Sequence, residues 1–414
     1  MSGRNSIPVA ARRVRLAYLV SHPIQYQAPL LRRIAIEPDI DLTVLFASDF
    51  SVRGYRDEGF GVDVRWDVPL LEGYRHIFLP RIRDSNDVSF ASPLNRGLLR
   101  ALKGGGTEPG FDVLWVHGYA TANSLHGMIV AKLLGIPVML RAESWLRDRS
   151  RSLGKLAGKR LFFSILESLI DAVLPIGTAN SEYWSYYFGD RVPQFLMPYA
   201  VDNEYFSERA RLAKFSRADL QAELGLDPAR PVVLFASKLQ ERKNCAHLIE
   251  AYARLVTSSP GLGAHLVVVG DGEERASLER RAAATGLDSI RFAGFRNQSE
   301  LPRFFDLASV FVLPSRHEPW GLIVNEAMNA ACPVIVSDDV GCAGDLVQEG
   351  VSGYIFPTGD IGALTDALCR VLVSPAVAQQ MGANAFVRIQ QWGFEQDIQG
   401  IRQAVQHLSP GFTA

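Results

Sequence analysis

Residues 310–331 read VFVLPSRHEPWGLIVNEAMNAA, and this stretch decides the fold. Its first four residues form an apolar run that ends at Pro314, which predicts a buried strand. The residues from Glu326 onward are strong helix formers and predict a helix. Glu318 therefore falls in a strand-to-helix loop. Glu326 falls one or two turns into the helix, because an α-helix has ~3.6 residues per turn.

The same stretch has the features of a ligand site. Glu318 and Glu326 form an E-x7-E pair. Backbone N–H groups at a helix start are unpaired and favour an anion, and Gly321 lets the backbone approach a ligand closely. Two carboxylates that bracket such a helix start suit a ligand with both hydroxyls and phosphates, for example a nucleotide-sugar. Glutamates at this spacing also occur by chance, so the interpretation depends on the surrounding motifs.

The alternation of strands and helices occurs in two sets along the chain. The first set has predicted strands at residues 15–20, 41–47, 112–117, 136–140 and 171–176. The second set has them at residues 231–236, 265–270, 290–294, 310–313 and 333–336. This alternation predicts parallel sheets with helices on both faces. The predicted fold class is α/β, with two doubly wound Rossmann-like domains that face a central cleft, where ligands bind.

We expect four segments. Residues 1–13 form a disordered leader that lacks the apolar middle of a signal peptide. Residues 14–203 form an acceptor-binding domain and residues 204–390 a nucleotide-sugar-binding domain. Residues 391–414 form a terminal helix.

Composition limits the classes of function. The chain has 414 residues, 48% of them hydrophobic, and a formal net charge of −1, so its charge gives no reason to expect a nucleic-acid partner. Its four cysteines lack C-x-x-C spacing, which predicts a reducing, cytoplasmic location without a disulfide framework. No apolar run reaches the ~18 residues of a spanning helix, so we expect no transmembrane segment.

The second half of the chain resembles the retaining family 4 glycosyltransferases of the GT-B fold. Leu313 to Leu322 is similar to the family's P-S-x-x-E-x-F-G-L segment, and Glu326-Ala327-Met328 continues it. Further similar segments are residues 238–244, 268–272, 292–295, 333–338 and 350–354. The resemblance covers the second domain densely and the first thinly. It implies that the terminal helix crosses back onto the first domain.

The resemblance also implies roles for individual residues. Lys238 and Lys243 would clamp the donor diphosphate, although the family usually has arginine where Lys238 stands. Glu318 would hold hydroxyls of the transferred sugar, and Glu326 would hold the ribose hydroxyls. The other residues predicted to bind the donor are Ser237, Gly270, Gly294, Phe295, Trp320, Gly321 and Leu322.

In the first domain, His117 ends a predicted strand and is similar to a family histidine beside the reacting sugar. With Lys238, Lys243 and Glu318 it completes the predicted catalytic set, and a core histidine is the alternative. The loop after the first strand departs from the Gly-Gly of many family members. The predicted acceptor-side residues are His22, Gln25 and Tyr26 from this loop, and Glu143 from the end of a later strand.

Two further features have alternative readings. Asp39-Ile40-Asp41 matches a D-x-D metal motif, but it precedes a predicted strand where a polar turn is expected, so we predict no metal requirement. The stretch from Arg147 to Arg160 is strongly basic. Peripheral contact with an anionic membrane or a lipid-diphosphate acceptor is one interpretation, and a solvated helix face is the other.

The sequence therefore predicts a retaining glycosyltransferase. Its co-substrate would be a nucleotide diphosphate sugar, with UDP favoured and no other cofactor. Its acceptor would be a hydroxyl of a glycan, a lipid-linked glycan or a small natural product. Two alternatives remain: a nucleotide-sugar epimerase of the same fold, and a non-catalytic nucleotide-sugar-binding partner in an assembly.

Overall fold

We report a computed structural model of the chain that describes residues 13–57, 62–64, 66–83, 88–105, 108–147 and 153–409. The leader expected at residues 1–13 lies outside these ranges except for Arg13. The guanidinium of Arg13 donates hydrogen bonds to the backbone carbonyls of Glu37 and Ile40, which ties this residue to the first sheet.

The first domain is built on a parallel sheet of six strands in the order β12-β11-β10-β1-β2-β5. Its strands are β1 (Val14–Val20), β2 (Ile40–Phe46), β5 (Arg75–Phe78), β10 (Val113–His117), β11 (Val138–Arg141) and β12 (Ala172–Val173). Its helices are α1 (Ala28–Ala35), α2 (Phe50–Arg53), α3 (Leu98–Lys103), α4 (Ala122–Leu133), α5 (Leu153–Glu167) and α6 (Thr178–Phe188). Short antiparallel pairs lie outside the sheet: β3 (Tyr55–Asp57) with β4 (Val62–Val64), β6 (Arg81–Arg83) with β7 (Leu94–Asn95), and β8 (Gly104–Gly105) with β9 (Glu108–Pro109).

The second domain repeats the design with a parallel sheet in the order β15-β14-β13-β16-β17-β18. Its strands are β13 (Val232–Ala236), β14 (His265–Val269), β15 (Ile290–Gly294), β16 (Val310–Leu313), β17 (Val334–Ser337) and β18 (Gly353–Phe356). Its helices are α7 (Asn203–Ala213), α8 (Arg217–Leu224), α9 (Cys245–Ser258), α10 (Arg275–Ala284), α11 (Leu301–Leu307), α12 (Leu322–Asn329), α13 (Ala343–Leu346), α14 (Ile361–Leu372) and α15 (Pro375–Ile389). Three 3₁₀ turns add Lys214–Ser216, Glu241–Lys243 and Pro260–Leu262.

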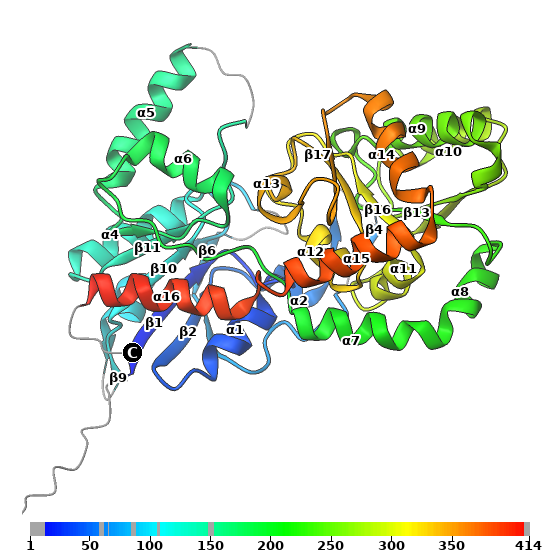
Figure 1. Ribbon diagram of the computed structural model, residues 1–414. Coiled ribbons are helices and arrows are strands. Elements are labelled where there is room, and N and C mark those ends of the chain that lie inside the picture. The colour runs from blue at the N-terminus through cyan, green and yellow to red at the C-terminus, as the bar shows by residue number, and fades with distance from the viewer. Residues whose placement is uncertain are drawn as a thin grey trace, which may run out of the picture.

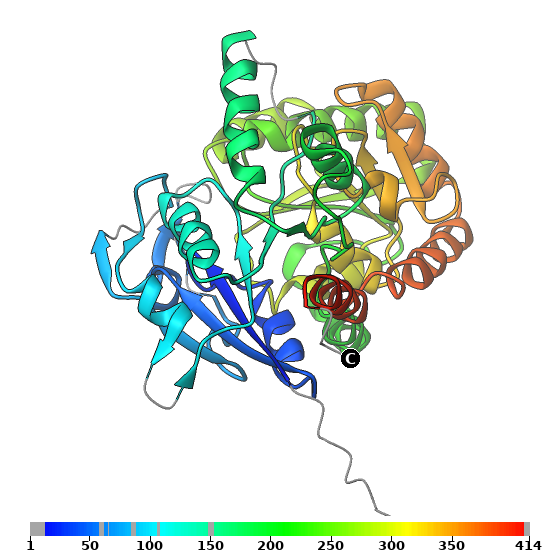
Figure 2. The ribbon, with the colours of Figure 1, turned by 90° about the vertical axis from the view of Figure 1, so that its left-hand side faces the viewer.

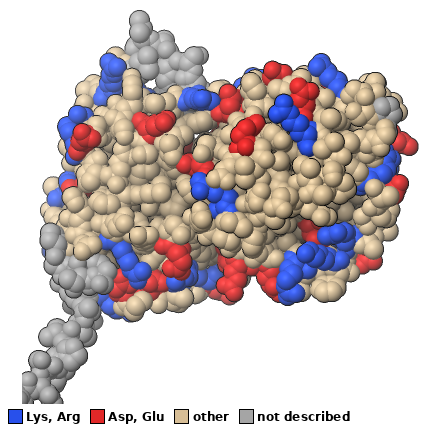
Figure 3. All heavy atoms as spheres, in the orientation of Figure 1, with Lys and Arg blue, Asp and Glu red and all other residues tan. Residues whose placement is uncertain are grey.

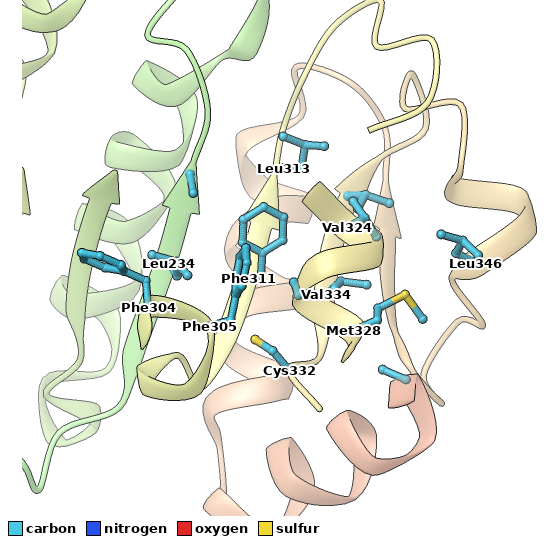
Figure 4. Packing of buried hydrophobic residues seen from close by; sticks show 14 of the residues in the cluster. Leu234, Phe304, Phe305, Phe311, Leu313, Val324, Met328, Cys332, Val334 and Leu346 are labelled. Carbon is cyan, nitrogen blue, oxygen red and sulfur yellow. The ribbon is translucent and has the colours of Figure 1, made fainter. Parts of the chain in front are cut away.

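Packing beneath the second sheet fixes the helix that the sequence singled out. Phe311 and Leu313 of β16 lie with Val324 and Met328 of α12 in one fully buried apolar cluster (Figure 4). Burying a side chain of this size contributes about 1.5–3 kcal/mol. The loop between β16 and α12 is therefore held at the carboxyl edge of the sheet.

The terminal helix α16 (Phe394–Leu408) packs on the first domain, while α15 lies against the second (Figures 1 and 2). Its Ile398 and Ile401 share a buried cluster with β1 and β2. Arg402 pairs with Asp39 at 2.7 Å and also contacts Glu37. This pairing lowers the pKa of Asp39, so the first aspartate of the D-x-D match holds a helix in place.

The α/β fold class, with two facing Rossmann-like domains and a helix that crosses back, is confirmed. Each predicted strand is present. The strands at residues 290–294 and 310–313 have the predicted bounds, the fifth shortens to Ala172–Val173, and the others shift by one or two residues at one or both ends. The sequence missed β5 and β18, which are edge strands. Three of the four residues of β5 are exposed, so it lacks the apolar run that marks a central strand.

The face of the molecule drawn in Figure 3 has no large patch of one charge sign. Basic and acidic side chains are interspersed over the face in Figure 3, as the formal net charge of −1 would suggest. Within the described ranges, no single helix is long and apolar enough to cross a membrane.

Candidate active site

A cavity of about 270 Å³ lies where the second domain faces the first. Its walls come mainly from the loops after β13, β15 and β16 and from the start of α12, and the first domain adds Gln25 and Trp66. The predicted residues that it gathers are Gln25, Ser237, Lys238, Lys243, Phe295, Glu318, Gly321, Leu322 and Glu326.

The loop from β16 to α12 depends on a glycine. Gly321 precedes the first turn of α12 with a φ of +94°, a region that L side chains rarely adopt. A Cβ atom at this position would lie 3.0 Å from Leu313 Cδ2 and 3.2 Å from Val340 Cγ1. This sharp turn brings Gly321, Leu322 and Ile323 to the cavity wall, where the first N–H groups of the helix carry a partial positive charge.

Two cations lie beside Glu318, and a third lines the same cavity. The ammonium of Lys243, at the end of the 3₁₀ turn Glu241–Lys243, contacts the Oε2 atom of Glu318. The guanidinium of Arg242 lies 3.5 Å from the same oxygen, and Lys238 also lines the cavity. Burial lowers the pKa of Lys243, and only the pairing with Glu318 opposes this. The excess of positive charge around one carboxylate suits a diphosphate.

Glu326 is a buried carboxyl group with one oxygen that has no partner among the described residues. Its side chain is buried in α12 at the cavity wall. Among the described residues, nothing forms a hydrogen bond with its Oε2 atom. Burial raises the pKa of Glu326 to about 8, and a hydrogen bond from Gln298 opposes this only partly. An unpaired buried polar atom is costly, so a ligand hydroxyl at this position would satisfy it.

Gly270 and Gly294 support the site from behind and do not line the cavity. The backbone N–H of Gly270 donates to the carbonyl of Gly294 at 2.8 Å. A Cβ atom on Gly270 would lie 1.9 Å from the backbone oxygen of Ser237. Gly270 therefore allows the close backbone packing against Ser237, and Ser237 and Phe295 themselves line the cavity.

Trp320 was predicted to bind the donor, and its side chain lies elsewhere. The indole is 3% exposed, its ring stacks on Trp392 with centroids 5.5 Å apart, and its N–H donates to Asn325 at 3.0 Å. A Cβ atom added to Gly177 of the first domain would meet this ring at 2.3 Å. Trp320 thus packs between the domains.

The first-domain candidates form a group of their own. His117 ends β10 and Glu143 follows the neighbouring strand β11, with His117 Nε2 and Glu143 Oε1 3.8 Å apart. The hydroxyl of Tyr26 donates to Glu143 at 3.2 Å. The ring of His22 packs at a tilt against Phe50, with centroids 4.4 Å apart. Burial first, and the nearby His117 second, lower the pKa of His22 to about 4, which keeps it neutral near pH 7.

Sequence reasoning missed several residues of both groups. The cavity is also lined by Trp66, Arg242, Arg296, Gln298, Leu301 and Ile323. The first-domain group includes Gln27, which lies 3.1 Å from His117, and Tyr199, which contacts Glu143. Arg242 directly precedes the predicted residue Lys243, so the family segment at residues 238–244 could have identified it. Trp66 and Tyr199 come from the other domain and the connection between domains, where the resemblance is thin.

With this geometry in view, comparisons with known proteins are informative. Residues 216–388 match the family profile described as glycosyl transferases group 1. Residues 216–388, which make up most of the second domain, belong to this family. A 34% identical segment of 170 residues is shared with alpha-D-kanosaminyltransferase from Streptomyces kanamyceticus and covers 41% of this chain and 43% of the relative. D-inositol 3-phosphate glycosyltransferase from Frankia alni is 26% identical over 75% of this chain and 78% of its own length.

Solved structures of the family fold match the whole chain. Sucrose-phosphate synthase from Thermosynechococcus elongatus superposes with a TM-score of 0.67 at 20% identity, over 96% of this chain and 99% of that one. Anabaena HepE in complex with UDP and glucose gives 0.68 at 18% identity, over 95% and 100%. At these identities the likeness establishes the fold. The match to this chain covers less than half the length of several of the sequence relatives.

Proposed function

We propose that the protein is a retaining glycosyltransferase that moves a sugar from a nucleotide diphosphate sugar, UDP favoured, to a hydroxyl group. The observation that carries this proposal is the unpartnered Oε2 of Glu326 in the cavity that also holds Lys243 and the start of α12. A ribose hydroxyl would satisfy the carboxylate, while the cations and helix N–H groups would bind the diphosphate. The solved complexes of HepE with UDP and with UDP-glucose support uridine as the base.

The arrangement suits departure of a diphosphate. When the bond between the sugar C1 and the phosphate oxygen breaks, its electron pair stays on the diphosphate, whose negative charge grows. Lys238, Lys243 and the start of α12 would stabilise that charge in the transition state. The acceptor hydroxyl oxygen would bond to C1 on the face that the diphosphate leaves, and its proton would pass to the departing phosphate oxygen. Glu318 would hold hydroxyls of the sugar.

Transfer without a metal ion is part of the proposal. The positive charge that a divalent cation would bring to a diphosphate is available from Lys238, Arg242, Lys243 and Arg296, which all line the cavity. Transfer that stops in EDTA and recovers with Mg²⁺ would contradict it.

For the acceptor we favour a hydroxyl compound bound at the first-domain wall. The names of relatives refer to D-inositol 3-phosphate and 2-deoxystreptamine, which are small cyclic polyols. A glycan or lipid-linked glycan is the broader class. The cytoplasmic location suggested by the cysteines stays a prediction.

Peripheral membrane contact through α5 is supported by exposed apolar residues. Leu161 and Ile165, one helical turn apart, are 66% and 58% exposed, and Arg160 beside them is exposed. Figures 1 and 2 show α5 projecting from the first domain. Apolar and basic residues on one projecting helix suit an anionic lipid surface. Residues 148–152 of the predicted basic stretch lie outside the described residues.

The first test is the binding of UDP, GDP, ADP and dTDP in the absence of metal. Binding is measured as the rise in the thermal unfolding temperature of the protein. A ligand at a hundredfold excess over its dissociation constant stabilises the native protein by roughly 2.7 kcal/mol. We expect stabilisation by UDP that is lost in Lys243→Ala. No shift with any nucleotide at millimolar concentration would contradict the proposal. Release of an isomerised free sugar would favour an epimerase, and binding without turnover would favour a non-catalytic partner.

A further inference from the structure

The first-domain group contains a carboxylate, Glu143, whose two oxygens differ. Tyr26, which contacts this carboxylate, directly follows Gln25 of the cavity wall. The Oε1 atom of Glu143 contacts the hydroxyls of Tyr26 and Tyr199 and lies 3.8 Å from His117 Nε2. In the described part of the chain, its Oε2 atom forms no hydrogen bond or ion pair, and the side chain is 36% exposed. One oxygen is therefore fixed by the protein, and the other is open to a ligand hydroxyl.

Tyr199 connects this carboxylate to the donor side of the cleft. Its hydroxyl contacts Glu143, whereas its backbone carbonyl accepts hydrogen bonds from the side chains of Asn325 at 3.0 Å and Trp392 at 3.1 Å. Asn325 directly precedes Glu326 in α12. A single buried residue thus bonds to the first-domain carboxylate at one end and to the donor-side helix at the other.

We propose that Glu143 accepts a hydrogen bond from the attacking hydroxyl, and that Tyr199 is the positioning residue that fixes Glu143 relative to α12. The proposal rests on the proposed function, because α12 must carry the donor for this alignment to matter. Glu143 takes no proton in the reaction, since the hydroxyl proton leaves with the diphosphate. Its contribution is orientation, and a misplacement of ~1 Å in a reacting group can cost about 100-fold in rate.

The charges around Glu143 are consistent with an acceptor of hydrogen bonds. The groups that face it are His117 on β10, Tyr26 in the loop after β1, and Tyr199. The guanidinium carbon of Arg141 in β11 lies 5.0 Å from the centroid of the Tyr199 ring. The same guanidinium forms an ion pair with Asp397. Burial alone would raise the pKa of Glu143, but the nearby His117 and the hydrogen bonds from Tyr199 and Tyr26 outweigh burial and lower it. Removing one tyrosine hydroxyl should therefore raise this pKa.

The test is the hydrolysis of UDP-glucose, in which water supplies the attacking hydroxyl. Its rate is measured as the release of UDP at a series of pH values between 4 and 8. We expect Tyr199→Phe to lower kcat by about 10- to 100-fold and to move the acidic limb of the pH profile upward. Glu143→Gln should lower kcat and remove that limb. UDP affinity, measured by calorimetry, should change less than about twofold in both variants.

Tyr252→Phe is the matched control, because Tyr252 is equally buried and its hydroxyl contacts Ala264 and Ser289 in the second-domain core. It should keep the kcat and pH profile of the wild type. A Tyr199→Phe protein with unchanged kcat and profile would overturn the positioning role, and a fully active Glu143→Gln protein would overturn the role of the carboxylate. Failure of the wild type to bind UDP would instead overturn the proposed function.

Discussion

Lys243 and Glu318 are 75 residues apart in the sequence, yet the ammonium of one contacts the carboxylate of the other in the cavity. The pair is almost buried, with side chains 9% and 13% exposed. In this setting the lysine has two functions: it neutralises the glutamate, and it contributes positive charge at the place where a diphosphate would lie.

Lys243→Ala should weaken UDP binding. A hydrogen bond to a charged group contributes about 1.5–3 kcal/mol, which corresponds to a loss of roughly 10- to 150-fold in affinity. Calorimetric titration with UDP measures this loss. Lys214→Ala is the control, because Lys214 is exposed at the end of α7 and outside the cavity. Equal affinity of the Lys243→Ala protein and the control would contradict the assignment.

Glu326→Gln should change the pH dependence of stability. The pKa of this carboxyl rises from an ordinary 4.5 to about 8 on folding. Its contribution to stability is therefore fully present below its unfolded pKa and is lost as the pH rises through its folded pKa. Urea unfolding should show wild-type stability falling from pH 5 to pH 8 relative to the variant. Parallel curves for the two proteins would refute the raised pKa.

The same residue predicts how UDP binding responds to pH. A ribose hydroxyl that donates to Glu326 favours the ionised carboxylate, so binding should release a proton near neutral pH. UDP affinity should accordingly rise between pH 6 and pH 8 in the wild type and stay flatter in Glu326→Gln. Calorimetry in two buffers of different ionisation enthalpy counts the released protons. Equal pH dependence in both proteins would count against the ribose contact.

Gly321→Ala should destabilise the protein by about 1–2 kcal/mol, the cost of a left-handed backbone for an L-residue. It should also weaken UDP binding, because the start of α12 must shift away from Leu313 and Val340. Gly344→Ala in α13 is the control: its added Cβ would meet nothing within 4 Å. Urea unfolding should show the control unchanged or slightly stabilised. A neutral Gly321→Ala variant would show that the turn tolerates a side chain.

Leu161→Glu with Ile165→Glu should abolish binding to vesicles that contain anionic phosphatidylglycerol, because both changes place negative charge on the exposed face of α5. Sedimentation with vesicles measures the bound fraction. Leu133→Glu is the control, because it adds negative charge at an exposed apolar residue of α4, outside α5; Leu133 is 79% exposed. This control should bind vesicles as the wild type does. If the wild type itself stays in the supernatant, the membrane contact is wrong.

The second domain could be predicted well because its strands are continuous apolar runs and its site lies in short loops between neighbouring elements. Glu318, Gly321 and Glu326 fall within one local segment, so spacing alone brought them together. Only the family resemblance put Lys243 and Glu318 in one site, and their direct pairing was not predicted, because the β13 and β16 loops meet only in three dimensions.

The first domain was harder for physical reasons. The contacts of Glu143 come from three separate segments, through Tyr26, His117 and Tyr199. No periodic pattern marks an edge strand such as β5, whose side chains are mostly exposed. Trp320 shows the converse error, since a residue inside a binding motif has its side chain in the packing between domains.

The chain passes between the two domains twice, near residues 198–203 and again near residues 389–394, and the two passages are bonded to each other. The side-chain amide of Asn203 donates to the carbonyls of Ile389 and Trp392, and the indole of Trp392 donates to the carbonyl of Tyr199. These two hydrogen-bonded connections act as the hinge between the domains. They oppose sliding of one domain along the other and leave rotation about their common axis as the easy motion, so the cleft should widen most at the end farthest from Tyr199.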